Sequence, residues 1–195
     1  SIDPPSLRNA LARRWRSHKD ICFIPVFCQT SRMKNLTATI CLAVALLLGS
    51  AGVSWSQDFQ KGLAAHESGD YATALREWTP LADQGNASAQ YNLGLMYDNG
   101  QGVPQDDKTA VKWYRLAAEQ GYASAQFNLG VMYGLGQGVI QDWVYAHMWG
   151  NVASSNGSVN GGKLRDLAAK KMTPSQLEKA QDLARKCVAK NYKGC

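Results

Sequence analysis

A 36-residue unit that occurs twice in tandem constrains the fold of this chain more than any other feature. When residues 86–121 are aligned with residues 122–157, 19 of the 36 positions are identical. The shared positions include Ala-x-Ala-Gln, Asn-Leu-Gly, Met-Tyr and Gly-Gln-Gly-Val. A period of about 20 to 50 residues indicates units that stack on one another and share a core. The sequence therefore predicts an all-α repeat solenoid, an architecture that usually serves binding.

Each full unit is expected to contain two helices around a glycine-rich loop, because apolar residues recur at helical spacing on both sides of that loop. The predicted helices cover residues 87–99, 106–120, 123–135 and 142–155. Residues 57–85 form a degenerate first repeat with a shorter loop and helices over residues 57–68 and 71–84. Aspartates precede the second helix of all three units and are predicted to cap it, namely Asp70, Asp106 and Asp142.

Gly94 and Gly130 lie in the middle of the first helix of each full unit, where glycine costs about 1 kcal/mol relative to alanine. Close approach of the second helix would offset that cost. We therefore expect the small side chains of Ala110 and Ala146 to face these glycines. The remaining seam positions are predicted to be filled by Leu93, Tyr97, Leu129 and Tyr133.

Residues 158–195 differ from the repeats and are predicted to cap the array with helices over residues 163–171 and 174–190. Thr173, Pro174 and Gln176 make a strong helix start, with a capping threonine, proline at the first position and glutamine three residues after the cap. A stacked array needs an end unit with a polar outer face. The many lysines of this segment fit that role.

The N-terminal part is interpreted as a processed leader. Residues 33–56 carry a short basic start, an apolar run and small residues at the end, which is typical of a secretory signal peptide. Cleavage is expected after Ser56, so that the mature chain begins at Gln57 without a membrane span and lies in the periplasm or outside the cell. An uncleaved anchor is the alternative. Residues 1–32 are read as an upstream extension from a misassigned start, or else as a cytoplasmic head.

The formal net charge of +6 does not indicate a nucleic-acid partner. Residues 1–56 carry seven basic and two acidic groups, whereas residues 57–195 carry 14 basic and 13 acidic groups. The mature part is nearly neutral, with an acidic repeat body and a basic tail over residues 163–195. A solvated helix surface is the favoured interpretation, and steering of an acidic partner by the tail is the sharper one.

Cysteine and histidine usage argues against metal or catalytic chemistry. After removal of the leader only Cys187 and Cys195 remain, and their spacing in an exported chain favours a disulfide. Two thiolates alone do not complete a zinc shell. His66 and His147 each stand outside any nucleophile or metal motif, so no catalytic residue, metal site or cofactor is predicted.

The two full units share the pattern A-x-A-Q-x-N-L-G-x-M-Y-x-x-G-x-G-V-x-Q-D. This pattern resembles the Sel-1-like repeat family, which is related to the tetratricopeptide repeats. Ile140 stands where the first copy has Pro104, and Gly150 stands where it has Tyr114. The resemblance implies a right-handed superhelix of antiparallel helix pairs and, usually, an adaptor role in assembling protein complexes. In bacteria the Sel-1-like repeat family includes exported members that regulate envelope signalling.

We therefore expect a monomeric, non-enzymatic adaptor of the bacterial envelope that grips a protein or peptide on the concave surface lined by the first helix of each unit. Asn92 and Asn128 are the favoured contacts, because a recurring asparagine can hydrogen-bond an extended backbone; local bonding between neighbouring helices is equally compatible with their position. The full set of candidate contacts is Ser88, Asn92, Leu95, Asn99, Ser124, Asn128, Val131 and Leu135.

Two other functions stay open at this point. Cysteine-rich members of the similar family are described as penicillin-binding or β-lactamase-like, which suggests an envelope hydrolase acting on β-lactams or peptidoglycan. Those members carry regularly spaced cysteines in each repeat, and this chain has none there. The other alternative is a structural scaffold within a larger assembly.

Overall fold

The structure is a computed structural model that describes residues 56–195. The predicted upstream extension over residues 1–32, and all of the predicted signal peptide except Ser56, lie outside the described residues. Within residues 56–195, no helix combines the length and the apolar character that crossing a membrane requires.

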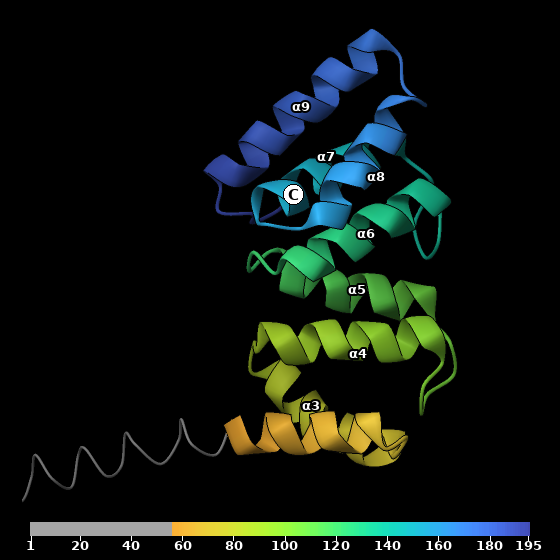
Figure 1. The fold of residues 1–195 in the computed structure, drawn as a ribbon, viewed down its shortest axis with the longest axis vertical. Coiled ribbons are helices and arrows are strands. Elements are labelled where there is room, and N and C mark those ends of the chain that lie inside the picture. Colours follow the sequence, from red (N-terminus) through yellow and green to blue (C-terminus); the bar gives the residue numbers. More distant parts are fainter. Residues whose placement is uncertain (1–55) are drawn as a thin grey trace, which may run out of the picture. The chain divides into compact units, whose positions relative to one another are not determined.

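The described residues form helices joined by short turns and loops, with no strand among them (Figure 1). The all-α repeat fold predicted from the sequence is thereby confirmed. A helix over residues 56–67 is followed by α3 (Tyr71–Asp83), α4 (Ala87–Asn99), α5 (Asp107–Ala118), α6 (Ala123–Leu135), α7 (Trp143–Ser155), α8 (Val159–Ala169) and α9 (Pro174–Ala189).

Packing within this unit is mainly between helices that are adjacent in the chain, from α3 on α4 through to α7 on α8. Two further contacts, α6 with α8 and α7 with α9, occur only at the C-terminal end. One buried cluster, which includes Trp78 and Leu93, lies around α3 and α4, and a second, which includes Tyr114 and Trp149, lies around α5, α6 and α7. Each unit thus buries its apolar side chains against its neighbours, as a stacked array requires.

The predicted aspartate caps are present at the second helix of all three units. The side chain of Asp70 accepts a hydrogen bond from the backbone N–H of Thr73, and Asp106 and Asp142 each accept two such bonds from the first turns of α5 and α7. These bonds satisfy N–H groups that have no partner inside the helix. They explain why the second helices begin where the sequence predicted.

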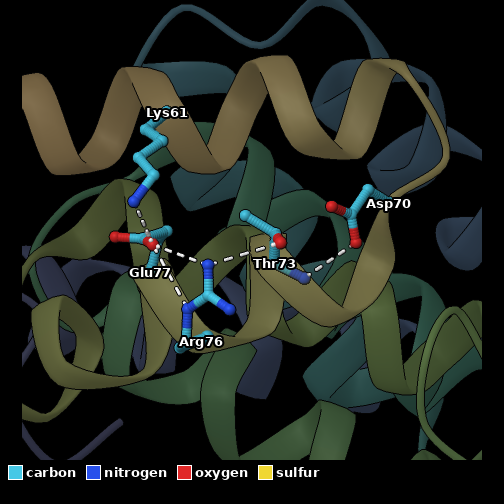
Figure 2. Close-up of polar contacts among 5 residues, drawn as sticks. All are labelled: Lys61, Asp70, Thr73, Arg76 and Glu77. Atoms are coloured by element: carbon cyan, nitrogen blue, oxygen red, sulfur yellow. Dashed lines mark hydrogen bonds and ion pairs between the residues drawn. The ribbon is translucent and has the colours of Figure 1, made fainter.

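The degenerate first unit is held together by an aromatic contact and an ion pair. A Cβ added to Gly62 would overlap the indole of Trp78, whose Nε1 donates to the backbone oxygen of Phe59 at 3.2 Å. Figure 2 shows Lys61 reaching from the helix over residues 56–67 to Glu77 on α3, with 2.7 Å between Nζ and Oε1. The Lys61 bond is the main reason that the pKa of Glu77 lies below its usual range.

The predicted alanine was wrong for Gly94, whereas the predicted close approach of the second helix is present at Gly130. A Cβ at Gly94 would lie 2.5 Å from Cδ1 of Tyr114, so the tyrosine ring covers this glycine, not Ala110. A Cβ at Gly130 would lie 2.8 Å from Cδ2 of Leu164 on α8, and Ala146 approaches through its backbone oxygen only, at 3.3 Å. Both alanines are fully buried. The Cβ of Trp149 would lie 3.2 Å from a Cβ on Gly130, so α7 packs closely on this glycine.

Helix α8 begins earlier than predicted, at Val159 rather than near Lys163. The side chain of Ser158 caps it by accepting from the backbone N–H of Gly161 at 3.1 Å. Glycines in this first turn obscured the helix in the sequence. They are needed because α8 packs closely on α7: a Cβ on Gly161 would lie 2.8 Å from the backbone oxygen of Gly150.

The C-terminal helices do not form a packed pair, since α9 lies against α7 rather than against α8. Beyond α9 the chain turns back through Asn191 and Tyr192, both with positive φ. The sulfur atoms of Cys187 and Cys195 are at bonding distance, with 5.5 Å between the two Cα atoms. This turn brings Tyr192 against Gly121 at the end of the first full repeat.

Candidate functional site

The predicted contact residues lie on α4 and α6, and the structure gives them different environments. Asn99, Ser124 and Leu135 are exposed. The half-buried members of the set are Ser88, Asn92, Leu95, Asn128 and Val131.

A tyrosine closes the seam between α4 and α5 in the first full repeat. Tyr114 is fully buried, its ring lies on Gly94, and its hydroxyl donates to Oδ2 of Asp98 at 3.0 Å. Burial, followed by the negative charge of Asp98, raises the pKa of Tyr114 far above its usual value. The phenol therefore stays neutral and acts as a fixed hydrogen-bond donor.

Asn128 is turned toward this seam. Its amide counteracts the rise that burial causes in the pKa values of Tyr91 on α4 and Tyr114 on α5. Ser124 has the same effect on the pKa of Tyr91. The corresponding Asn92 makes no side-chain hydrogen bond within residues 56–195. Both asparagines are half-buried.

The second full repeat lacks both members of the Tyr114–Asp98 pair. Glycine stands at each equivalent position, Gly150 and Gly134. Leu164 of α8 fills the part of the vacated space that lies over Gly130. The backbone of α8 fills the space at Gly150, where an added Cβ would lie 2.8 Å from the nitrogen of Arg165. The space beside Gly134 stays open next to Trp143, whose ring would lie 3.3 Å from a Cβ on Gly134.

This opening is an apolar groove of about 290 Å³ between α6 and α8, which we call the α6/α8 groove. Figure 1 shows these two helices running next to each other. Leu135 and Leu167 on its edges are 62% and 51% exposed, which is high for large apolar side chains. The lining residues are Phe127, Val131, Gly134, Leu135, Trp143, Asn160, Lys163, Leu164 and Leu167.

Val131 and Leu135 are the predicted contact residues that line the groove. Helix α8 supplies the opposite wall, and none of its residues was predicted as a contact, because the candidate contacts were chosen on the first helix of each repeat. Lys163 is the one charged residue in the lining, and it forms no ion pair within residues 56–195. The groove therefore combines apolar walls with a single available cation.

Buried glutamines connect successive units, and the prediction missed them. Gln126 is fully buried; its Nε2 donates to the backbone oxygen of Ala118 at 3.0 Å, and its Oε1 accepts from Nδ2 of Asn156 at 2.8 Å. Gln90 repeats this pattern with Ala82 and Gln120. The conserved spacing of 36 between these glutamines was the available signal. We call Gln90, Gln120, Gln126 and Asn156 the amide ladder.

The other polar groups point to no reaction chemistry. His66 pairs its Nε2 with Oε1 of Gln101 at 3.1 Å and packs against the rings of Tyr71 and Trp78. Within the part of the chain that the structure describes, no three His, Cys, Asp or Glu side chains are grouped so as to hold a metal ion.

Comparison with known proteins agrees with this architecture. Residues 87–122 and 123–158 each match the family model of the Sel1 repeat. Two solved structures share the fold: a protective antigen of uropathogenic Escherichia coli strains, c5321, which displays an SLR fold, and a Sel1 repeat protein from Oxalobacter formigenes. The first has a TM-score of 0.68 and 32% identity and covers 71% of this chain. The second has a TM-score of 0.57 and 28% identity and covers 68%.

A curated mouse protein, DAP3-binding cell death enhancer 1, is 38% identical over 73 residues, which is 33% of this chain. Its rat counterpart is 39% identical over 71 residues, or 32% of this chain. The matched segment spans 14% of each of these two proteins, and the matches to the two solved structures span 30% and 55% of their chains. The likeness therefore concerns the repeat unit and not those whole proteins.

Proposed function

Since residues 87–158 of this chain are two Sel1 repeats, we propose that it is a non-enzymatic protein-interaction module whose binding site is the α6/α8 groove. Sel1 repeats typically mediate protein–protein interaction. The observation that carries the proposal is the opening beside Gly134, where the preceding repeat carries Asp98, the partner of Tyr114. Apolar walls left exposed at such an opening favour a partner that removes them from water.

The proposed occupant is a short polypeptide segment with one or two large apolar side chains next to a carboxylate. The apolar side chains would lie between Val131 and Leu135 on one wall and Leu167 on the other. The carboxylate would pair with Lys163, which has no partner of its own among the described residues. Burying one large apolar side chain is worth about 1.5–3 kcal/mol, so a single groove of this size supports modest affinity.

This proposal moves the main contact from the asparagines to the apolar residues of α6. Neither Asn92 nor Asn128 lines the α6/α8 groove. Leu135 lines the groove and exposes 62% of its apolar side chain to solvent. The proposed contact region is therefore limited to the C-terminal end of the array, at α6 and α8.

A peptide library displayed on phage and selected with the full chain would test the site. We expect enriched peptides to carry a large apolar residue with Asp or Glu within a few positions. Leu135→Asp should weaken their binding about tenfold or more, the equivalent of one buried side chain. Ile140→Asp is the matched control, because Ile140 is 90% exposed and does not line the groove.

Reversing the charge of Lys163 gives a second, independent test of the site with the same peptide library. Lys163→Glu should shift the enriched peptides from acidic to basic residues beside the apolar anchor, because the sign of the lining charge is reversed. Peptides that bind the parent, Leu135→Asp and Lys163→Glu proteins equally would overturn the groove as the site. A selection that enriches nothing would also count against it.

We also propose that the chain is exported to the periplasm or beyond, with Cys187 joined to Cys195. The leader pattern over residues 33–56 and the adjacent sulfur atoms support this. Cell fractionation should find the protein outside the cytoplasm. The mass of the intact protein should match a chain that begins at Gln57, with two hydrogen atoms fewer than the form in which both cysteines are thiols. A cytoplasmic protein that retains residues 33–56 would contradict the proposal.

A further inference from the structure

The splayed arrangement of α8 and α9 leaves a second cavity, distinct from the α6/α8 groove. It has a volume of about 490 Å³ and is bounded by α7, α8 and α9. In contrast to the groove it is lined mainly by polar groups. The lining residues are His147, Asn151, Arg165, Asp166, Ala169, Leu177, Gln181 and Arg185.

His147 is the buried member of this lining. It is 3% exposed, and its Nδ1 has no hydrogen-bond partner within residues 56–195. Burial, followed by the positive charge of Arg165, lowers its pKa, while Asp166 acts in the opposite direction. The ring lines the cavity through other atoms, because Nδ1 is itself closed off from solvent.

The remaining lining offers more hydrogen-bond donors than it uses. Arg165 donates through Nε to Oδ1 of Asp166 at 2.8 Å, which occupies the one carboxylate of the cavity. Arg185 has only a long contact of 3.6 Å with Asp182.

That Asp182 carboxylate is held more closely by Lys186, at 2.6 Å. The side-chain amides of Asn151 and Gln181 make no hydrogen bond within the described part of the chain. Three donors from α7 and α9 therefore surround the cavity without an acceptor.

We propose that this cavity binds a small oxyanion, through a carboxylate or phosphate group held by Arg185, Gln181 and Asn151 beside His147. Two guanidinium groups against one carboxylate give the lining a net positive charge. Arginine and amide donors match oxyanions in both charge and geometry. The ligand would also add a bridge between α7 and α9, which already pack directly on each other.

Solution NMR of the full chain, titrated at constant ionic strength with inorganic phosphate and separately with citrate, would test the site. We expect saturable shifts of the His147 ring and of the Arg185 Nε–H signal, with at least one of the two anions. The His66 ring lies in the first unit against Trp78 and Tyr71, so it serves as an internal reference that should not move.

Arg185→Gln should weaken binding about tenfold, as expected for the loss of one charge-assisted hydrogen bond. Arg76→Gln is the matched control, since Arg76 and Arg185 are 67% and 68% exposed and Arg76 is paired with Glu77 on α3. Thermal unfolding of both variants checks that they remain folded. Equal binding by Arg185→Gln and the parent would overturn the proposal.

The two anions separate the chemical sources of the ligand. Tighter binding of phosphate would identify a phosphate group as the ligand, and tighter binding of citrate would identify a carboxylate. Shifts that rise linearly for both anions, or that are as large at His66 as at His147, would show general ionic effects and no site.

Discussion

The two full repeats are nearly the same in sequence and differ in how their seams are closed. In residues 86–121 the ring of Tyr114 lies on Gly94 and is tied to Asp98, so the unit closes its own seam. In residues 122–157 glycines replace both side chains, and Leu164 enters from outside the unit. The seam of the first full repeat is closed by side chains of that repeat, whereas the seam of the second depends on α8, the helix that follows it.

This difference teaches where binding capacity arises in a stacked array. A closed seam leaves no room for a partner, and its stabilising contacts lie within one unit. An open seam gains a groove but relies on α8 for the missing contact. Four changes in the chain would test this comparison.

Tyr114→Ala should have the largest effect on stability. It would leave an empty space over Gly94, whereas in the second repeat α8 covers Gly130 with Leu164 and Gly150 with its backbone. Removal of a fully buried aromatic ring costs about 3–5 kcal/mol, measured as the free energy of unfolding in urea. Tyr114→Phe keeps the ring and loses only the bond to Asp98, so it should cost about 1 kcal/mol. A cost below about 1 kcal/mol for Tyr114→Ala would contradict the closed-seam description.

Gly161→Ala should destabilise the open seam from the other side. Its new Cβ would lie 2.7 Å from the backbone nitrogen of Ser154, so α8 must move away from α7. Overpacking of this kind costs about 1–3 kcal/mol.

Gly162→Ala is the neighbouring control, because its Cβ would meet only the Ser154 hydroxyl, at 3.4 Å. It should stabilise the protein by up to about 1 kcal/mol through helix propensity. Thermal unfolding of the two variants in opposite directions would confirm the close α7–α8 contact. Equal effects would show that glycine at position 161 has no packing role.

The amide ladder allows a comparison of equivalent glutamines. Gln126→Ala leaves the oxygen of Ala118 and the amide of Asn156 without a partner, at a cost of about 1–3 kcal/mol. Gln90→Ala should cost less, because its partner Gln120 is exposed and can bond to water. Urea titrations of both variants would show the difference. A larger loss for Gln90→Ala would mean that the ladder is weaker at the C-terminal end.

The smallest effect is expected in the degenerate first unit, where an ion pair assists the Gly62–Trp78 contact. The pKa of Glu77 is lowered in the folded state, mainly by Lys61. The stabilisation it provides is complete above the ordinary glutamate pKa of about 4.3 and is lost as the pH falls through the lower folded value. Melting temperatures measured across that range should fall less in Glu77→Gln than in the parent. Identical slopes would show that the pair contributes nothing.

The sequence was sufficient to predict the elements that repeat. The helices of both full units, the aspartate caps and the final helix from Pro174 lie within two residues of their predicted bounds. These features are encoded locally, by apolar spacing and by capping residues. Periodicity could not reveal what covers Gly130, because Leu164 lies outside the repeat and reaches it only through the tertiary packing of α8.

The glycines of α8 misled the prediction for a related reason. Gly161 lowers helix propensity, and so it reads as a loop residue, but in the fold it permits contact with Gly150. The groove was missed because the α8 wall was assigned to the end cap, and contacts were predicted only on the first helix of each repeat. The glutamines of the amide ladder were visible as repeated letters, but their burial depends on three helices that only the fold brings together.

The residues that shape the open groove belong to the junction between the last repeat and α8, and most other contacts join helices adjacent in the chain. Duplication of the interior repeat would therefore lengthen the array without altering this junction. Array length and groove chemistry can therefore evolve independently. The length changes by copying 36 residues, and the groove changes by single substitutions at lining positions such as Gly134.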